Sequence, residues 1–139
     1  MIDVYSYETG ERQPKIEKIQ TISTTGPKAL SQLTAASSMR LSTDEKHMFC
    51  GNAGDNTVTV YDRDPKTGLL DYICCLPISG SYPKDICVFP DDKHIASINH
   101  ENGSITFFSV DYKKGLLIMN GKEIKVNEPN SCVIVKVGE

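Results

Sequence analysis

The chain contains three histidines, and histidine is the side chain that most readily exchanges a proton near neutral pH. His47 and His94 stand 47 residues apart in similar polar stretches, so we interpret both as turn residues. At the position that corresponds to His100 one repeat earlier, the sequence has Ala53. His100 is therefore freer to be functional, and we predict it as a catalytic general base that activates water. The alternative is an ordinary exposed loop histidine.

Two cationic side chains and one carboxylate could act on an anionic group. Arg40 begins a predicted innermost strand, where the equivalent residue one repeat later is Cys87. Lys84 and Asp85 stand at the entrance of the next innermost strand. We predict a catalytic role for Arg40 in binding or stabilising negative charge, and substrate binding by Lys84 and Asp85. The alternatives are an ion pair between neighbouring repeats for Arg40 and a salt bridge at the sheet edge for Lys84 and Asp85.

Asn52 and Asn99 also occupy equivalent positions, each at the start of a loop that follows a strand. Asparagine side chains often cap such loops by hydrogen bonding to nearby backbone groups. Because both loops are expected to face the same channel, the two residues are also candidate substrate-binding residues.

An internal repeat relates these positions to one another. Three segments align with three later segments at one ungapped offset of 47 residues: 39–47 with 86–94, 57–61 with 104–108, and 66–70 with 113–117. Residues 2–5 resemble 58–61, so the chain is expected to begin inside a repeat. Residues 131–135 are predicted to form the first strand of a further copy.

Within one repeat the pattern is that of β-strands. Val58 and Val60 alternate with Thr59, which is the period of a strand with two unlike faces. Four short strands in roughly 40–50 residues are typical of a propeller blade. We predict an all-β fold, a partial β-propeller of about two and a half to three four-stranded antiparallel blades. Its single domain is expected to divide into a partial blade, two blades and the first strand of another: 1–36, 37–83, 84–130 and 131–139.

Composition argues against several classes of protein. The formal net charge of -3 and the pI near 5.6 do not favour nucleic-acid binding. No apolar run approaches the roughly 18 residues of a membrane span. The N-terminal residues lack the apolar stretch of a secretory signal, so a cytoplasmic location is expected. The five cysteines contain no CxxC pair, which predicts reduced core side chains and no metal site.

Several short motifs resemble one family. M-R-L-S-T-D at 39–44, followed by N-x-G-x-N-T-V-x-V-Y at 52–61, resembles the I-R-I-S-P-D and S-N-R-G-H segments of seven-bladed lactonase propellers. Y-P-K-D-I at 82–86 resembles their W-P-R-D-F, and E-P-N-S-C-V at 128–133 resembles the P-x-P-V-C-V with which many members end. The resemblance covers nearly the whole chain and matches the C-terminal part of the family.

This resemblance implies a 6-phosphogluconolactonase or a related cycloisomerase that uses no metal or organic cofactor. It places a sugar lactone or another small anionic ligand near the channel, where Arg40 matches an arginine of the family and His100 could activate water. Ala53 and Asp55 stand where the family has an arginine and a histidine, and Lys84 replaces a second arginine. Neither alanine nor lysine reproduces the bidentate grip of a guanidinium group on an anion.

Two functions are consistent with these observations. The first is a sugar-lactone hydrolase of carbohydrate metabolism, or the C-terminal fragment of one. The second, which Ala53 favours, is a non-catalytic propeller segment that serves as a binding or assembly module. A partial ring leaves apolar blade faces and a sheet edge uncovered, so we expect self-association, or further blades, to cover them.

Overall fold

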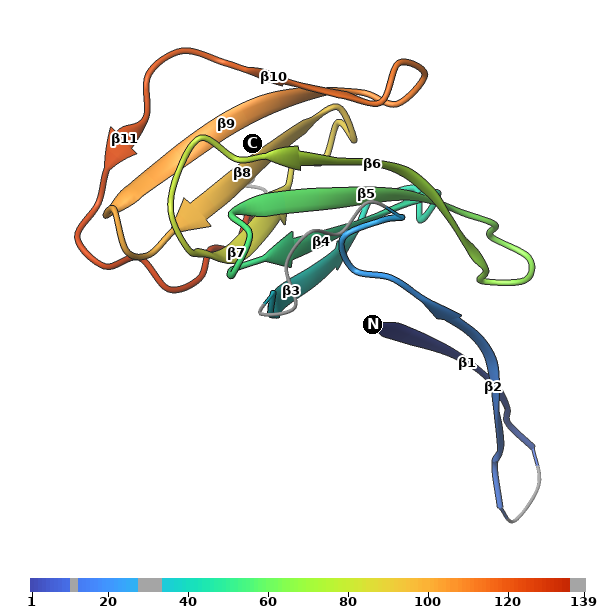
Figure 1. Cartoon of the computed structure of the whole chain (residues 1–139). Coiled ribbons are helices and arrows are strands. Elements are labelled where there is room, and N and C mark those ends of the chain that lie inside the picture. The colour runs from blue at the N-terminus through green and yellow to red at the C-terminus, as the bar shows by residue number, and fades with distance from the viewer. Residues whose placement is uncertain (11–12, 28–33, 136–139) are drawn as a thin grey trace.

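A computed structural model describes residues 1–10, 13–27 and 34–135 of the chain. These residues form eleven β-strands and no helix, in three antiparallel sheets (Figure 1). The predicted all-β, partial-propeller fold is confirmed. The first sheet is a hairpin of β1 (Ile2–Glu8) and β2 (Lys15–Ile22), which extends away from the two larger sheets. Nowhere in the described ranges is there a helix that could cross a membrane.

Each of the two larger sheets is a meander in which consecutive strands lie side by side. The first contains, in spatial order, β3 (Ala36–Leu41), β4 (His47–Asn52), β5 (Thr57–Arg63) and β6 (Leu70–Pro77). The second contains β7 (Pro83–Val88), β8 (His94–Asn99), β9 (Ser104–Asp111) and β10 (Leu116–Met119), with β11 (Ile124–Lys125) also pairing with β9. β7 begins 47 residues after β3, and β8 begins 47 residues after β4. We call these sheets the first and second blades.

The main core lies between the two blades. Alternate residues of a strand point to opposite faces of its sheet. Phe49 and Val60 of the first blade therefore pack toward the second blade, where they join Ile86, Ile95 and Phe108 in one buried cluster. This face-to-face contact fixes the positions of the loops at the ends of both blades.

The opposite face of the first blade packs against the hairpin. Met48, Cys50 and Tyr61 alternate with the residues of the main core and form a second buried cluster with Ile2 of β1. The Tyr61 hydroxyl donates to the carbonyl of Ser23 at 2.5 Å, which holds the segment after β2 against the blade. The two central strands of the first blade, β4 and β5, thus carry apolar side chains on both faces, as expected for a blade with a neighbour on either side.

The C-terminal segment lies beside β7 without forming a strand. Residues 131–135 have no strand pairing, and residues 136–139 lie outside the described part of the chain. An inner strand of a further blade would need a hydrogen-bonded partner strand, and the described residues give 131–135 none. The division of the chain at 36/37, 83/84 and 130/131 stays a prediction.

The expectation that all five cysteines are reduced is wrong for one pair. Cys87 and Cys132 form a disulfide, with a Cα–Cα distance of 6.3 Å. Cys50, Cys74 and Cys75 are free, as predicted. The pairing arises because the C-terminal segment runs alongside the inner strand of the second blade, so residues 45 positions apart in the sequence become neighbours.

The turn between β3 and β4 is organised by one carboxylate. Asp44 Oδ1 accepts hydrogen bonds from Ser42 Oγ at 2.7 Å and from the Lys46 amide at 3.1 Å. These bonds stabilise the ionised form, that of Ser42 most strongly, and lower the pKa of Asp44 from 3.8 to about 2.

Removal of this carboxylate should make the fold less sensitive to acid. Because the pKa of Asp44 is lower in the folded chain than in the unfolded one, its ionised form stabilises the fold above pH 3.8. This contribution is lost as the pH falls from 3.8 toward 2. In Asp44→Asn, the melting temperature followed by circular dichroism should therefore fall less steeply over this range than in the wild type. Parallel curves for the two proteins would contradict the assignment.

Candidate functional site

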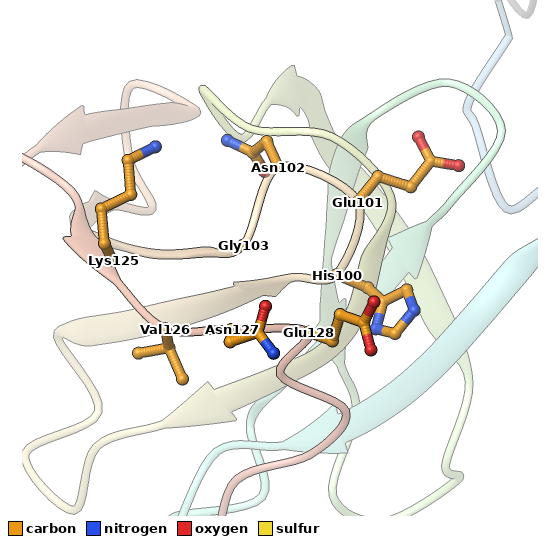
Figure 2. A pocket seen from close by; sticks show the side chains of 8 residues that line it. All are labelled: His100, Glu101, Asn102, Gly103, Lys125, Val126, Asn127 and Glu128. Atoms are coloured by element: carbon orange, nitrogen blue, oxygen red, sulfur yellow. The ribbon is translucent and has the colours of Figure 1, made fainter.

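An open, polar pocket of about 470 Å³ lies at one end of the second blade (Figure 2). Its volume is within the range of roughly 300–1,000 Å³ that is usual for small-molecule sites. Two segments build it: the loop between β8 and β9, and the chain from β11 to the residues that follow it. The lining residues are His100, Glu101, Asn102, Gly103, Lys125, Val126, Asn127 and Glu128.

Backbone hydrogen bonds join the two segments. The Val126 amide donates to the carbonyl of Gly103 at 3.0 Å, and the Gly103 amide donates to the carbonyl of His100 at 3.3 Å. Gly103 has φ of 55°, and a Cβ atom there would lie 3.1 Å from the carbonyl oxygen of Val126. Glycine is thus required where the loop turns and meets β11 closely. The loop between β8 and β9 is held as one wall of the pocket.

His100 is oriented by the segment after the pocket. Its side chain is half-buried, and Nδ1 lies 3.2 Å from the carbonyl oxygen of Pro129. A carbonyl oxygen can only accept, so Nδ1 carries the hydrogen in this contact. The neutral imidazole then has its lone pair on Nε2, for which the described residues provide no hydrogen-bond partner. Tyr82 supports the ring at a centroid distance of 6.3 Å. This is the arrangement that a general base requires.

The far side of the pocket carries a lysine. Lys125 and His100 lie on opposite sides of the pocket (Figure 2). Lys125 Nζ forms a 2.5 Å ion pair with Glu123, and its side chain is largely exposed. The hydrogen bond from Lys125 is the main reason that the pKa of Glu123 is lowered. The pocket therefore combines a candidate base with one lysine, which is paired with Glu123, and with the carboxylates of Glu101 and Glu128.

Arg40, Lys84 and Asp85 lie along the inner strands instead of in this pocket. Arg40 Nη2 forms a 2.8 Å ion pair with the buried carboxylate of Asp85, from the first blade to the second. Lys84 Nζ donates to Asn130 Oδ1 at 2.7 Å. Lys84 and His100 thus both contact the segment that follows the pocket, whereas Arg40 lines a separate pocket. The structure does not bring Arg40 and His100 into one site.

Asn52 and Asn99 are fully buried. Asn52 Nδ2 donates to the Thr24 carbonyl at 2.9 Å and to Thr59 Oγ1 at 3.0 Å. Asn99 Nδ2 donates to Thr106 Oγ1 at 3.1 Å, and its Oδ1 accepts from Ser97 Oγ at 2.8 Å. Most of these contacts are to side chains of the same blade, and one joins Asn52 to the Thr24 carbonyl, so we interpret both asparagines as structural residues. Their capping of the following loops and their binding of substrate stay predictions.

Substitution of one buried asparagine tests this interpretation. Asn99→Ala removes the acceptor of the buried Ser97 hydroxyl, while Thr106 keeps its bond to the Ile78 carbonyl, and should lower the free energy of unfolding by about 1–3 kcal/mol. Asn127→Ala is the matched control, because Asn127 is exposed and should stay within about 0.5 kcal/mol of the wild type. Urea denaturation measures both changes. An Asn99→Ala variant as stable as the control would contradict the structural role.

Several pocket residues were not found from the sequence. Glu101, Lys125 and Glu128 were not singled out, although the link between blades was expected to share a face with the loop of His100. Residues 125–128 follow an outer strand that is interrupted at 120–123, and this interruption has no counterpart in the strand β6. The repeat therefore gave no aligned position from which these residues could be recognised.

The two blades are four-stranded meanders that pack face to face, with their inner strands β3 and β7 next to each other. This arrangement is a section of a β-propeller. The family described as "Lactonase, 7-bladed beta-propeller" matches residues 1–135. The chain belongs to this family.

Individual relatives agree with this assignment. The uncharacterized protein YwcC of Lactococcus lactis is 27% identical over 133 residues, covering 96% of this chain and 38% of that protein. A 6-phosphogluconolactonase of Bacillus subtilis is 20% identical over 127 residues, covering 91% of this chain and 36% of the enzyme. The structure of a periplasmic gluconolactonase of Pseudomonas aeruginosa, PpgL, superimposes with a TM-score of 0.80 at 20% identity, covering 92% of this chain and 34% of the other. The chain thus spans little more than a third of the length of these relatives.

Proposed function

We propose that this chain is a sugar-lactone hydrolase similar to 6-phosphogluconolactonase, or the C-terminal part of one, and acts in carbohydrate metabolism. The observation that carries the proposal is the geometry of His100. Its Nδ1 is held by the Pro129 carbonyl, which leaves Nε2 for water at the edge of a polar pocket. Membership of the lactonase family supports a lactone as the substrate.

In the proposed reaction, His100 Nε2 takes a proton from water as the water oxygen attacks the lactone carbonyl carbon. The ring C–O bond then breaks, and the proton passes from His100 to the departing ring oxygen, which becomes a hydroxyl group. The product is the open-chain hydroxy acid, whose carboxyl group then releases its proton to the solvent and becomes a carboxylate. General-base catalysis of this kind contributes a factor of about 10²–10⁴ to the rate.

We propose that the lysines bind the anionic end of the substrate. Lys125 lines the pocket opposite His100 (Figure 2). Lys84 approaches the same region through its contact with Asn130. A lysine attracts a phosphate as a point charge, without the bidentate geometry of arginine. We propose that Arg40 and Asp85 join the two blades and act on the site only by holding β7 in place.

The direct test is a hydrolysis assay with 6-phosphogluconolactone and unphosphorylated gluconolactone in non-reducing buffer. The proposal predicts a saturable rate above spontaneous ring opening, and the comparison of the two substrates shows whether Lys125 attracts a phosphate in spite of the carboxylates of Glu101 and Glu128 in the same pocket. A rate equal to that of buffer, from a sample shown to be folded by circular dichroism, would overturn it.

The second candidate function is a non-catalytic binding or assembly module. The loop between β4 and β5 favours it, because Ala53 is buried at the position where the family has an arginine. A ligand that binds without being hydrolysed in the same assay would support this candidate.

We also propose that copies of this chain associate with one another. Tyr7 and Ile16 of the hairpin and Val133 near the C-terminus are strongly exposed apolar side chains, at 70%, 66% and 82%. Tyr7 and Ile16 lie opposite each other in the hairpin, so together they form one exposed apolar surface that a second copy could cover, whereas Val133 stands apart from them in the C-terminal segment. Size-exclusion chromatography with light scattering should give a mass that is a multiple of 15.3 kDa. A folded monomer at micromolar concentration would contradict this prediction.

We place the protein in the cytoplasm as part of the same proposal. A phosphorylated lactone is charged, and an unpaired charge does not readily enter the hydrocarbon core of a membrane. Fractionation of cells that express the natural protein tests this location.

A further inference from the structure

Side-chain contacts at equivalent positions join β3 to β7 and β7 to the C-terminal segment. Arg40 and Asp85 form an ion pair across 45 residues of sequence, and Cys87 and Cys132 form a disulfide across 45 residues. Since Cys87 is the residue one repeat after Arg40, and Cys132 the residue one repeat after Asp85, the two contacts are equivalent. The disulfide therefore joins β7 to the C-terminal segment at the position where the ion pair joins β3 to β7.

The second tie anchors the segment that supports the proposed site. In this segment, the Pro129 carbonyl accepts from His100, Asn130 accepts from Lys84, and the Cys132 amide donates to Asp85 Oδ2 at 3.2 Å. No strand pairing holds the described residues 131–135. The Cys87–Cys132 bond is thus the covalent attachment of a segment that is otherwise held by single hydrogen bonds.

The bond is open to attack from one side. Cys132 is half-buried within an exposed stretch, whereas Cys87 is buried in β7. A pocket of about 170 Å³, which Arg40 and both cysteines line, lies against the bond. Thiol–disulfide exchange requires access of a thiolate to one sulfur, and a nearby cation favours the thiolate form. In a cytoplasmic protein, a disulfide is usually transient or redox-sensing instead of permanent.

We propose that the Cys87–Cys132 pair is a redox modification site that controls the contacts of residues 129–135 with His100 and Lys84. A dithiol reductant attacks Cys132 Sγ through one thiolate, which forms a mixed disulfide and releases Cys87 as a thiolate that takes up a proton. The second thiol of the reductant displaces Cys132 as its thiol, so two electrons and two protons pass to the protein. Reduction releases the segment, and His100 loses the carbonyl that orients it. The effect on hydrolysis rests on the proposed lactonase function.

The test uses the full chain and follows two properties in the oxidised state and after reduction with dithiothreitol. Hydrogen exchange measured by mass spectrometry reports on residues 129–135, with β4 and β8 as internal references that must stay protected. Hydrolysis of 6-phosphogluconolactone reports on the site. Three further samples are the double variant Cys87→Ser/Cys132→Ser, and as matched controls Cys75→Ser, whose cysteine is free, and Cys74→Ser.

Reduction should speed exchange in residues 129–135 of the wild type and of the controls, while the double variant exchanges fast in both conditions. The value of kcat/KM should fall about ten- to a hundredfold on reduction, as expected for a misplaced catalytic group. Unchanged exchange after complete reduction, shown by thiol labelling, would overturn the proposal. So would faster exchange with an unchanged rate of hydrolysis that is clearly above the spontaneous rate in both states. If exchange responds but both states hydrolyse at the spontaneous rate, the redox control of the segment is supported and the lactonase function fails.

Discussion

Loss of the Cys87–Cys132 bond is expected to lower the free energy of unfolding by about 2–4 kcal/mol. The bond joins residues separated by 45 positions, and the closed loop contains β8 to β11 of the second blade. Such a loop restricts the unfolded chain, and the bond holds the C-terminal segment on β7. Urea denaturation of the wild type and of Cys87→Ser in non-reducing buffer measures the difference.

Reduction of the wild type should shift its denaturation midpoint to that of Cys87→Ser. Cys75→Ser is the control: it keeps the bond, so it should unfold like the oxidised wild type and respond to reductant in the same way. Superimposable curves for wild type and Cys87→Ser in the absence of reductant would show that the bond does not stabilise the fold.

Substitution of His100 by glutamine should reduce kcat/KM for lactone hydrolysis by about 10²–10⁴-fold. Glutamine retains an N–H group that can donate to the Pro129 carbonyl, but it has no basic nitrogen to accept a proton from water. The loop should therefore keep its structure while the proposed catalytic group is lost. Initial rates, corrected for spontaneous ring opening, measure the effect.

His94→Gln is the matched control for this prediction. His94 lies at the opposite end of β8, where its Nδ1 contacts Asp91 at 2.6 Å, far along the strand from the pocket. Its substitution should leave the rate within about twofold of the wild type, in line with the small effects of most surface changes. Equal rates for His100→Gln and the wild type would remove His100 from the mechanism.

The fold could be predicted because its signals are local and recur along the chain. Val58 and Val60 show the alternation of a strand, and Gly68 and Gly115 mark turns at equivalent positions. Both glycines have positive φ, 76° and 63°. Residues 131–135 carry the same strand pattern, but a strand also needs a hydrogen-bonding neighbour, which the pattern cannot supply.

The disulfide could not be predicted in the same way. Cys87 reads as a core residue of a strand, and Cys132 lies in an isolated segment with no pattern of paired cysteines. Their proximity depends on how β7 and the C-terminal segment run next to each other. The ion pair of Arg40 with Asp85 likewise depends on how two inner strands lie next to each other. From the sequence, an ion pair between repeats and a catalytic role were both open for Arg40.

The candidate site was recognised only in part. His100 was found because its equivalent, Ala53, has no acid–base chemistry. Lys125 and Glu128 were missed because they follow the interruption between β10 and β11, where the repeat is irregular. Asn52 and Asn99 recur at equivalent positions, which is typical of residues that stabilise each blade, and their burial agrees with that role.

We propose that a sugar-acid ligand binds at the end of the second blade. The most direct measurement is a titration of the isotope-labelled chain with 6-phosphogluconate, the stable product of the proposed reaction, followed by NMR. We expect saturable chemical-shift changes in the amides of 100–103 and 124–128 and in the His100 imidazole. Changes confined to the inner strands around Arg40, or no changes at millimolar ligand, would contradict it.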